Sequence, residues 1–372
     1  MFESGKGHHS YSINQIILLF ICIIILLVST CKMNNILIIG LGVASTAYAS
    51  LLDYNKNKIF ILGTPLDKKK IIKINKNKKK IDPIFQVNFS NNVQFFSNIK
   101  KLESIKFSLV VVGVNTNGLE WAINQINLIN LNCPILLLTK GLCVFNNKIQ
   151  TISDYFKSKT KIKHIVSAAG PCLAGELIKR THTRTLLSST SIKVANFVKN
   201  ILKNNFYHPV ISNDYKGSEI CAAIKNIYAT VIGAAMGQSN SYLKFKDKKN
   251  NYFNAASFLF EQSLKEMTII VKKYKGKPNT VLGPAGAGDL YVSALGGRNS
   301  KLGFFLGQGF NFKKIISSQM RNITVEGSDL ILKIGSILIR EIGSKKLPLL
   351  NFLFTAIVKN QKFIINWKKI SN

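Results

Sequence analysis

Acidic residues are scarce in this sequence. Its 372 residues include 17 Asp and Glu against 51 Lys and Arg, so the formal net charge is +34 at pH 7. Such a balance favours nucleic acid, a membrane surface or anionic metabolites as partners. The lysines are mixed with Asn and Ile along much of the chain, as in "IIKINKNKKKID" from Ile71. This spread indicates a solvated basic surface more than a shaped patch, and it would still draw in an anionic substrate.

Motifs for binding nucleic acid or metal are also missing. The sequence has no zinc-finger spacing and no aromatic RNA-reading motif, so we expect no nucleic-acid partner. Its cysteines form no CxxC pair, which argues against a zinc site and against a secreted disulfide framework. We expect no bound metal, and we expect small buried residues at the six cysteines, Cys22, Cys31, Cys133, Cys143, Cys172 and Cys221.

An unbroken apolar run, Ile16–Val28, lies near the amino terminus. A membrane-spanning helix needs about 20 mostly apolar residues, so this run is borderline, and it also resembles the core of a signal peptide. Three interpretations stay open: an anchor or signal, an upstream extension that is not made, or a buried helix. Because Met33 directly precedes the first predicted strand, we interpret residues 1–32 as an extension that the chemistry does not need. We expect a cytoplasmic protein, with a membrane tether through residues 13–31 if the extension is retained.

The next segment predicts a dinucleotide-binding turn. The apolar run Ile36–Gly40 is typical of a buried parallel strand, and a helical pattern follows the turn Gly40-Leu41-Gly42. Gly40 permits the turn, Gly42 lets the backbone approach a pyrophosphate, and the helix N-terminus offers free N–H groups. Ser45 replaces the third glycine of the usual fingerprint, so a plain strand–turn–helix corner remains the alternative.

The second predicted strand, Lys58–Thr64, bears on the choice of cofactor. Sites for NAD often place an acid at the end of this strand to bind the ribose hydroxyls. Here the first acid is Asp67, which comes slightly late and is followed by three lysines. NADP is therefore at least admissible as the cofactor.

Later apolar runs extend the predicted sheet, and their polar ends supply candidate ligands. Strands are predicted at 107–114, 134–142 and 163–171, and ligands bind where parallel strands end. Lys140 and Gly170 stand at two of these ends. We therefore predict an α/β fold: a Rossmann-like parallel-sheet domain over residues 33–208, followed by an all-α domain over residues 209–372.

Lys225 interrupts the apolar pattern of a predicted helix, Gly217–Gly237. It lies at the edge of the apolar stripe, so its side chain either reaches water or is held in a semi-buried site. Partial desolvation would lower the pKa of a lysine and suit it to proton transfer.

The stretch from Gly283 to Asn299 is rich in glycine, and we predict that it is not the interior of a helix. Asp289 follows a turn of small residues. Arg298 is an attractive phosphate ligand because arginine presents a planar fork of donors. A flexible loop with a surface arginine is the alternative.

Taken in order, these segments resemble the NAD- or NADP-dependent glycerol-3-phosphate dehydrogenases over nearly everything after Met33. The matching segments are "GLGVASTAYA", "LTKGL", "GPCLAGE" (170–176), "EICAAIKNIYA" (219–229), "GPAGAGDL" with "GGRN", and "TVEG" (324–327). The resemblance implies reversible reduction of dihydroxyacetone phosphate to sn-glycerol 3-phosphate by NADH or NADPH, which feeds glycerophospholipid synthesis. The expected partners are this small phosphorylated substrate and a second copy of the chain in a homodimer.

The resemblance also implies roles for individual residues. Lys225 would be the catalytic proton donor and acceptor. The implied substrate-binding residues are Lys140, Gly170, Lys225, Asp289, Arg298 and Asn299. The implied cofactor-binding residues are Gly40, Gly42, Val43, Ala44, Ala174, Arg298 and Glu326.

Several departures from the family pattern mark a divergent member. Cys172 replaces the usual Ser, Asn115-Thr116 stand where Pro-Ser is usual, and Gly297 replaces a common Ser. Glu261-Gln262-Ser263 replaces Thr-Arg-Gly, which we expect to remove a positive charge near the site. Two alternatives therefore stay open: another two-domain reductase of the hydroxyacid or ketopantoate type, or a membrane-tethered dinucleotide-binding protein with reduced catalysis.

Overall fold

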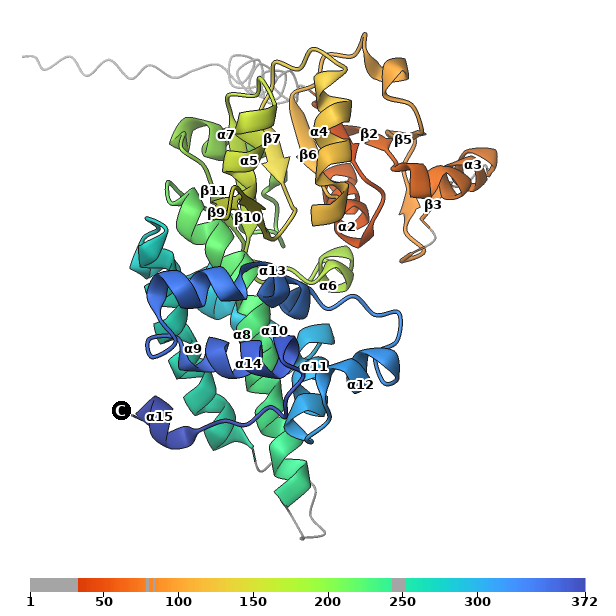
Figure 1. Ribbon diagram of the computed structural model, residues 1–372. Coiled ribbons are helices and arrows are strands. Elements are labelled where there is room, and N and C mark those ends of the chain that lie inside the picture. Colours follow the sequence, from red (N-terminus) through yellow and green to blue (C-terminus); the bar gives the residue numbers. More distant parts are fainter. Residues whose placement is uncertain (1–32, 78–79, 83, 243–251, 372) are drawn as a thin grey trace, which may run out of the picture. The chain divides into compact units, whose positions relative to one another are not determined.

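The computed structural model describes residues 33–77, 80–82, 84–242 and 252–371 (Figure 1). The apolar extension, the predicted tether and two cysteines, Cys22 and Cys31, lie outside the described residues. Residues Asn35–Asn372 form one compact unit. We describe that unit below.

An eight-stranded sheet occupies the first half of the unit. Its strand order is β12-β11-β10-β7-β6-β1-β2-β5. From β5 to β10 all neighbours are parallel, whereas β11 runs antiparallel to β10 and β12 is parallel to β11. Counted in sequence, the six parallel strands follow the order 3-2-1-4-5-6 of a dinucleotide-binding fold. The strands are β1 (Asn35–Ile39), β2 (Lys58–Leu62), β5 (Val93–Phe96), β6 (Leu109–Val112), β7 (Ile135–Leu137), β10 (Ile165–Ala169), β11 (Leu186–Ser188) and β12 (Val210–Ser212).

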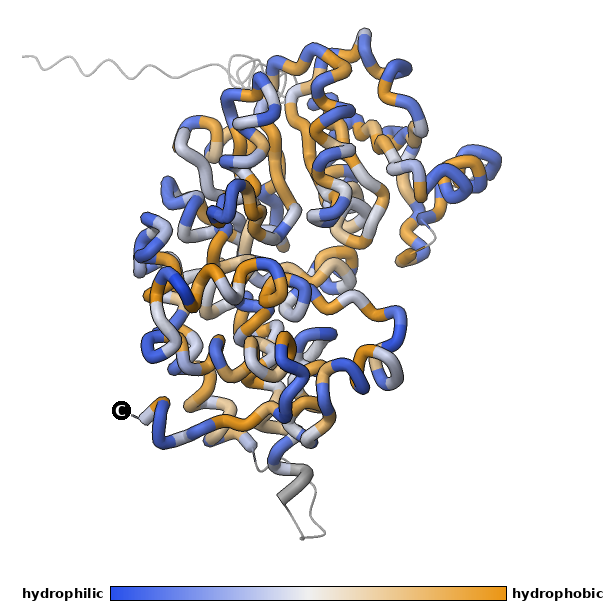
Figure 2. The backbone as a smooth tube through the Cα atoms, viewed as in Figure 1, coloured by the Kyte–Doolittle hydropathy of each residue, from blue (hydrophilic) through white to orange (hydrophobic). Residues whose placement is uncertain are grey.

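Both faces of this sheet are covered, which explains why its strands are continuous apolar runs (Figure 2). In β1, Ile36 and Ile38 pack in the core shared with α2 (Val43–Tyr54) and α7 (Ile192–Leu202). Leu37 and Ile39 point to the other face, into the core shared with α4 (Leu119–Asn127) and α5 (Ile152–Lys159). The remaining elements of this half are η1 (Pro65–Asp67), α3 (Lys68–Lys76), β3 (Lys80–Ile81), β4 (Asn88–Phe89), η2 (Ile99–Leu102), η3 (Thr116–Gly118), β8 (Leu142–Phe145), β9 (Lys148–Thr151) and α6 (Ala174–Ile178).

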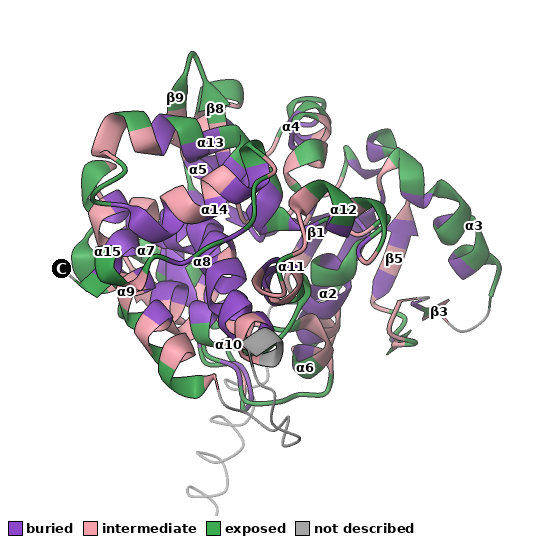
Figure 3. Cartoon of the chain, turned by 60° about the horizontal axis from the view of Figure 1, so that its bottom comes forward, coloured by how far each residue is buried: buried purple, intermediate pink, exposed green. Residues whose placement is uncertain are grey.

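The second half is helical and is built around α8 (Tyr215–Tyr242), which Figure 3 shows as largely buried. Within the described chain, α8 is the one helix long and apolar enough to cross a membrane, but 89% of its apolar window is buried inside the protein. It is therefore a core helix. The others are α9 (Phe253–Lys273), η4 (Pro278–Thr280), η5 (Pro284–Gly288), α10 (Asp289–Leu295), α11 (Arg298–Gly307), α12 (Phe312–Ser317), α13 (Glu326–Ile342), α14 (Pro348–Val358) and α15 (Trp367–Ser371).

The predicted order, a parallel-sheet domain followed by a helical domain, is confirmed. The division at residues 208 and 209 stays a prediction, and the last strand of the sheet, β12, lies just beyond it at Val210–Ser212. A buried carboxylate joins the two halves. Glu219 on α8 accepts hydrogen bonds from the Ser153 N–H at 3.0 Å and from the hydroxyls of Ser153 and Ser167, which belong to α5 and β10.

Glycines let α8 and α11 approach each other at backbone distance. Gly233 and Gly237 on α8 lie against the backbone of α11, and Gly303 and Gly307 on α11 lie against the backbone of α8, so each helix carries a pair of glycines four residues apart. A Cβ added at Gly303 would lie 1.9 Å from the carbonyl oxygen of Thr230. Arg298, the predicted phosphate ligand, is the first residue of α11, so this close packing of the two helices also positions Arg298.

We predict that Gly303→Ala destabilises the protein. In a helix interior alanine is favoured over glycine by about 1 kcal/mol, but overpacking costs about 1–3 kcal/mol or more, and here backbone would have to move. Urea unfolding should show the loss as a lower midpoint with an unchanged slope. Gly296→Ala is the matched control, because an added Cβ there meets no atom within 4 Å. Equal stability of the two variants would contradict the prediction.

Candidate active site

Lys225 lies in the interior and shares a buried carboxylate with a second lysine. Its Nζ donates to Asp289 Oδ1 at 2.9 Å and to Ser293 Oγ at 2.6 Å. Lys140 Nζ donates to Asp289 Oδ2 at 2.7 Å. The side chains of Lys225 and Asp289 are 9% and 5% exposed, so the semi-buried interpretation of Lys225 is confirmed.

Burial and charge shift the pKa values of this cluster in opposite senses. Burial, which disfavours the ammonium, lowers the pKa of Lys225, and Lys140 lowers it further, although the Asp289 carboxylate partly opposes both. Burial alone would raise the pKa of Asp289, but the two lysines outweigh it and hold that pKa below its ordinary value. The site therefore contains a permanent anion beside a lysine that gives up its proton more readily than usual.

Lys140 and Gly170 come from the ends of neighbouring parallel strands, as the sequence predicts. Lys140 Nζ donates to the Gly170 carbonyl at 3.1 Å, and Gly170 has a φ of +109°. The run 134–142, predicted as one strand, is divided: β7 ends at Leu137, and β8 begins only at Leu142. The Thr139 hydroxyl donates to the Val114 carbonyl at 2.7 Å and so holds the segment after β7 against the segment after β6. Lys140 follows directly, at the carboxyl end of the parallel strands.

The other predicted substrate ligands gather beside Asn226, the residue after Lys225. Asn299 donates from Nδ2 to Asn226 Oδ1 at 3.0 Å and accepts from the Gly327 N–H at 2.8 Å. Arg298 forms an ion pair with Glu326, and both side chains are about half exposed. Asn299 is thus tied to the middle of α8 and to the start of α13, while Arg298 keeps an exposed guanidinium.

Four of these side chains line a pocket of about 260 Å³. Lys140, Asn226, Arg298 and Glu326 contribute to its wall, together with Asn115 and Thr116 from the loop after β6. The pocket has the charged, partly enclosed lining of a site for a small anion.

The predicted cofactor residues lie at the start of α2 and on its neighbour α6. Gly40 has a φ of +102°, and Gly42, the N-cap residue of α2, provides no side-chain cap. Gly42, Val43 and Ala44 are exposed, so the N–H groups of the first turn are open to a ligand. Ala174 begins α6, which packs against α2. This arrangement fits a bound dinucleotide pyrophosphate.

Ser45 stands where the fingerprint has its third glycine, and it packs closely as the small side chain suggests. It is buried, and its hydroxyl donates to the Gly113 carbonyl at 3.3 Å. A Cβ added at Gly113 would lie 2.1 Å from that hydroxyl, so Gly113 gives Ser45 the space it needs.

Two departures from the family pattern have a structural outcome. Cys172 is partly buried against the core beside Tyr48, and burial raises the pKa of its thiol to about 11. The Glu261–Ser263 segment lies on α9, where Glu261 is half exposed and pairs with Lys265. In the part of the chain that the structure describes, no ion pair joins this segment to Lys225 or Asp289, and the effect of its charge on the site stays a prediction. The predicted burial holds fully for Cys221; Cys133, Cys143 and Cys172 are intermediate.

The glycine-rich stretch before Arg298 is helical, which corrects the prediction of a non-helical segment. A π-helical turn, η5, leads into α10, which begins at Asp289. The glycines permit this because a Cβ added at Gly286 would lie 2.0 Å from the Val281 carbonyl. Sequence reasoning missed Ser293 for the same reason: four residues after Asp289, it shares a helix face with it.

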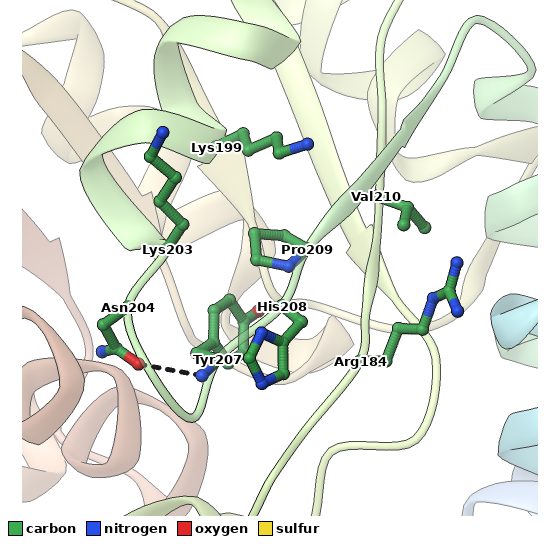
Figure 4. Close-up of a pocket in the computed structure, with 8 residues that line it drawn as sticks. All are labelled: Arg184, Lys199, Lys203, Asn204, Tyr207, His208, Pro209 and Val210. Atoms are coloured by element: carbon green, nitrogen blue, oxygen red, sulfur yellow. Dashed lines mark hydrogen bonds between the residues drawn. The ribbon is translucent and has the colours of Figure 1, made fainter.

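A larger pocket, of about 730 Å³, lies beside β12 and is separate from these residues (Figure 4). Arg184, Lys199 and His208 line it, and the Tyr207 N–H at its base donates to the Asn204 side chain at 2.8 Å. It contains none of the predicted site residues. Among the residues that the structure describes, there is also no cluster of three or more His, Cys, Asp or Glu that could hold a metal ion.

Comparison with known proteins adds independent information. A family model described as the N-terminus of NAD-dependent glycerol-3-phosphate dehydrogenase matches residues 35–195, and the C-terminal model of the same family matches residues 214–365. A protein from Archaeoglobus fulgidus named NADP(+)-dependent glycerol-3-phosphate dehydrogenase is 29% identical over 293 residues, which cover 76% of this chain and 83% of that protein. A Mycoplasma mobile protein named glycerol-3-phosphate dehydrogenase [NAD(P)+] is 28% identical over 88% of this chain and 93% of its own length.

Solved structures agree on the fold. The glycerol-3-phosphate dehydrogenase of Plasmodium falciparum covers 91% of this chain and 96% of its own, with a TM-score of 0.80 at 18% identity. A structure described as a ketopantoate reductase from Ralstonia solanacearum reaches 0.53 at 12% identity. The ketopantoate-reductase-like interpretation is therefore the weaker one.

We predict that Asp289→Asn destabilises the protein, and that the loss shrinks as pH rises. Without the carboxylate, Lys140 and Lys225 face each other uncompensated, so the pKa of Lys225 in the folded protein falls further below its ordinary 10.5. Between that lowered pKa and 10.5 the folded protein binds fewer protons than the unfolded chain, so its stability increases with pH. Breaking a buried pair costs about 3–5 kcal/mol near pH 7.

Urea unfolding at pH 7 and pH 9 measures this deficit. Asp329→Asn is the matched control, because Asp329 is exposed in the first turn of α13 and contributes at most about 1 kcal/mol through the helix dipole. A deficit of the same size at both pH values would show that Lys225 does not titrate as inferred.

Proposed function

Because the chain belongs to the NAD(P)-dependent glycerol-3-phosphate dehydrogenase family, we propose that its pocket carries out the reversible reduction of dihydroxyacetone phosphate to sn-glycerol 3-phosphate. The protein is an oxidoreductase that uses NAD or NADP and acts on a small phosphorylated substrate. The observation that carries this proposal is the pair Lys140 and Lys225 converging on the buried Asp289, with Lys140 also lining an anion-sized pocket. Supply of glycerol 3-phosphate to glycerophospholipid synthesis follows from the same activity.

Lys225 is the proposed proton donor to the carbonyl oxygen in the reductive direction and the proton acceptor in the oxidative direction. Its lowered pKa brings the ammonium closer to the range in which a general acid is effective. Asp289 holds the ammonium in place from one side and Ser293 from another, so the remaining N–H is oriented. The positive charge also stabilises the alkoxide that develops as the carbonyl is reduced.

Lys140 is proposed to bind the substrate from the sheet side, since its second bond, to the Gly170 carbonyl, keeps it at the strand ends. Arg298 is proposed to hold the phosphate, with Asn299 beside it. Glu326 pairs with Arg298 and would aim its guanidinium, and both residues would also contact the cofactor. This placement brings the carbonyl to Lys225 while the phosphate is fixed at the other end.

The dinucleotide is proposed to bind through Gly40, Gly42, Val43 and Ala44, with Ala174 from α6 alongside. Open N–H groups at the start of α2 would hold its pyrophosphate. When bound, it supplies the hydride, while the chain's own residues supply position and the proton.

A homodimer and a cytoplasmic location are also proposed. Large apolar side chains are exposed on the helical half, among them Phe253, Tyr291 and Leu295, and burying such side chains would favour self-association. Light scattering on the purified chain tests the dimer. If residues 1–32 are retained, residues 13–31 would tether the enzyme to a membrane, and a mass measurement of the mature amino terminus decides this.

We predict that a protein comprising Met33–Asn372 oxidises NADH or NADPH when dihydroxyacetone phosphate is added, and that Lys225→Ala reduces turnover by about 10²–10⁴-fold. The absorbance of the reduced cofactor gives the rate. Lys216→Ala is the control, since it removes a lysine from the same helix at a position with no bond to Asp289. Binding of both ligands to the wild-type protein without turnover would sink the proposal.

The pH dependence should have opposite signs in the two directions. Reduction needs the ammonium form of Lys225, so its kcat/KM should fall as pH rises through a pKa that burial holds below 10.5. Oxidation of glycerol 3-phosphate needs the neutral amine and should rise over the same range. Rates measured in both directions at fixed ionic strength test this, and parallel profiles would exclude Lys225 as the titrating group.

A further inference from the structure

Residues at the carboxyl end of β2 contact the adenosine ribose of the cofactor in dinucleotide-binding folds. β1 and β2 are parallel neighbours, with Ile39 paired to Leu62, so the residues after Leu62 lie beside the glycine turn after Ile39. In dinucleotide-binding folds an acid here binds the free ribose hydroxyls of NAD, and a cation here accommodates the 2′-phosphate of NADP. The charge available after Leu62 therefore bears directly on cofactor choice.

The first position beyond the strand is crowded by side chains of the next segment. A Cβ added at Gly63 would lie 2.4 Å from Ile71 Cδ1 and 3.0 Å from Asp67 Cβ. Gly63 is buried, and its N–H bonds to the Phe96 carbonyl at 3.0 Å. An acid at this position would require the Ile71 side chain to shift from its buried position.

Asp67, the acid nearest in sequence, is turned inward and used as a cap. Its Oδ2 accepts from the Thr64 N–H at 3.0 Å and from the Thr64 hydroxyl at 2.7 Å. Its Oδ1 accepts from Lys70 Nζ at 3.2 Å. Asp67 is 7% exposed. Both carboxylate oxygens are therefore engaged by Thr64 and Lys70, and their burial places them poorly for a ribose hydroxyl.

Cations, by contrast, are exposed at this end of the sheet. Lys68 and Lys69 open α3 directly after Asp67, are exposed, and form no ion pair with any residue that the structure describes. The adjacent strand β5 ends next to β2 and leads into η2, which adds Lys100 and Lys101 before Glu103. The local field is positive where a 2′-phosphate would lie.

We propose that the enzyme prefers NADPH to NADH, with Lys68 and Lys69 holding the 2′-phosphate; this rests on the proposed function. The inward Asp67 positions the first turn of α3, and with it the two lysines. The preference arises from two local features together. The Asp67 carboxylate is bonded to Thr64, and Lys68 and Lys69 beside it form no ion pair with any described residue.

The test compares both cofactors in the reduction of dihydroxyacetone phosphate. The wild type should show a kcat/KM at least about tenfold higher with NADPH, the difference expected for one charge-assisted contact to phosphate. The double variant Lys68→Gln/Lys69→Gln should lose roughly that factor with NADPH through KM, with kcat and the NADH values nearly unchanged.

Lys73→Gln/Lys76→Gln is the matched control, because it removes the same charge from the exposed end of the same helix. If both double variants lose equally, or if both cofactors weaken alike, general electrostatics replaces a specific contact and the proposal fails. A wild type that uses NADH as well as or better than NADPH also overturns it, and leaves the proposed reaction intact.

A binding measurement separates this proposal from the reaction itself. Calorimetry with adenosine 2′,5′-bisphosphate and with AMP needs no turnover. The bisphosphate should bind about tenfold more tightly than AMP, and the advantage should disappear in Lys68→Gln/Lys69→Gln only. Equal affinities would reject the 2′-phosphate site even in an active enzyme, whereas a clear difference in a chain without turnover would reject the reaction and keep the site.

Discussion

One buried carboxylate, that of Asp289, holds the site together. It accepts from Lys140, which stands at the edge of the sheet, and from Lys225, which stands on the central helix. Two ammonium groups so close would repel each other strongly in a buried place. The carboxylate between them makes the arrangement stable and joins the two halves of the unit at the proposed substrate site.

The surrounding structure serves to bring Asp289 to that point. Asp289 is positioned by the π-helical turn η5 and by α10, of which it is the first residue. Lys225 is positioned by α8, whose place is fixed by close packing against α11. Glu219, two turns before Lys225, is clamped to the sheet by Ser153 and Ser167. Burial raises the pKa of Glu219 despite these bonds, so the clamp has a desolvation cost that its donors offset in part.

What the sequence predicts well is what depends on neighbours along the chain. The run Ile36–Gly40 and its glycine turn have a local signature, and the structure confirms them. Ser293 could not be found this way, because its role requires α10 to be a helix, and the glycines before it suggested otherwise. The surroundings of Glu261 were out of reach for a related reason: a substitution in a family motif says what has changed, but only packing shows that the new side chain pairs with Lys265.

The scarcity of acidic residues gains a physical meaning in this setting. A chain with a net charge of +34 attracts anions over much of its surface, so attraction alone does not select a ligand. Selection requires cations fixed in position, and fixing them requires counter-charges. Asp289 fixes Lys140 and Lys225, Glu326 pairs with Arg298, and Asp67 caps the loop that carries Lys68. At Asp289 and at Asp67 the lysines outnumber the acid, so the charge left for an anionic ligand is positive. At Arg298 the acid Glu326 balances the charge and serves to position the guanidinium.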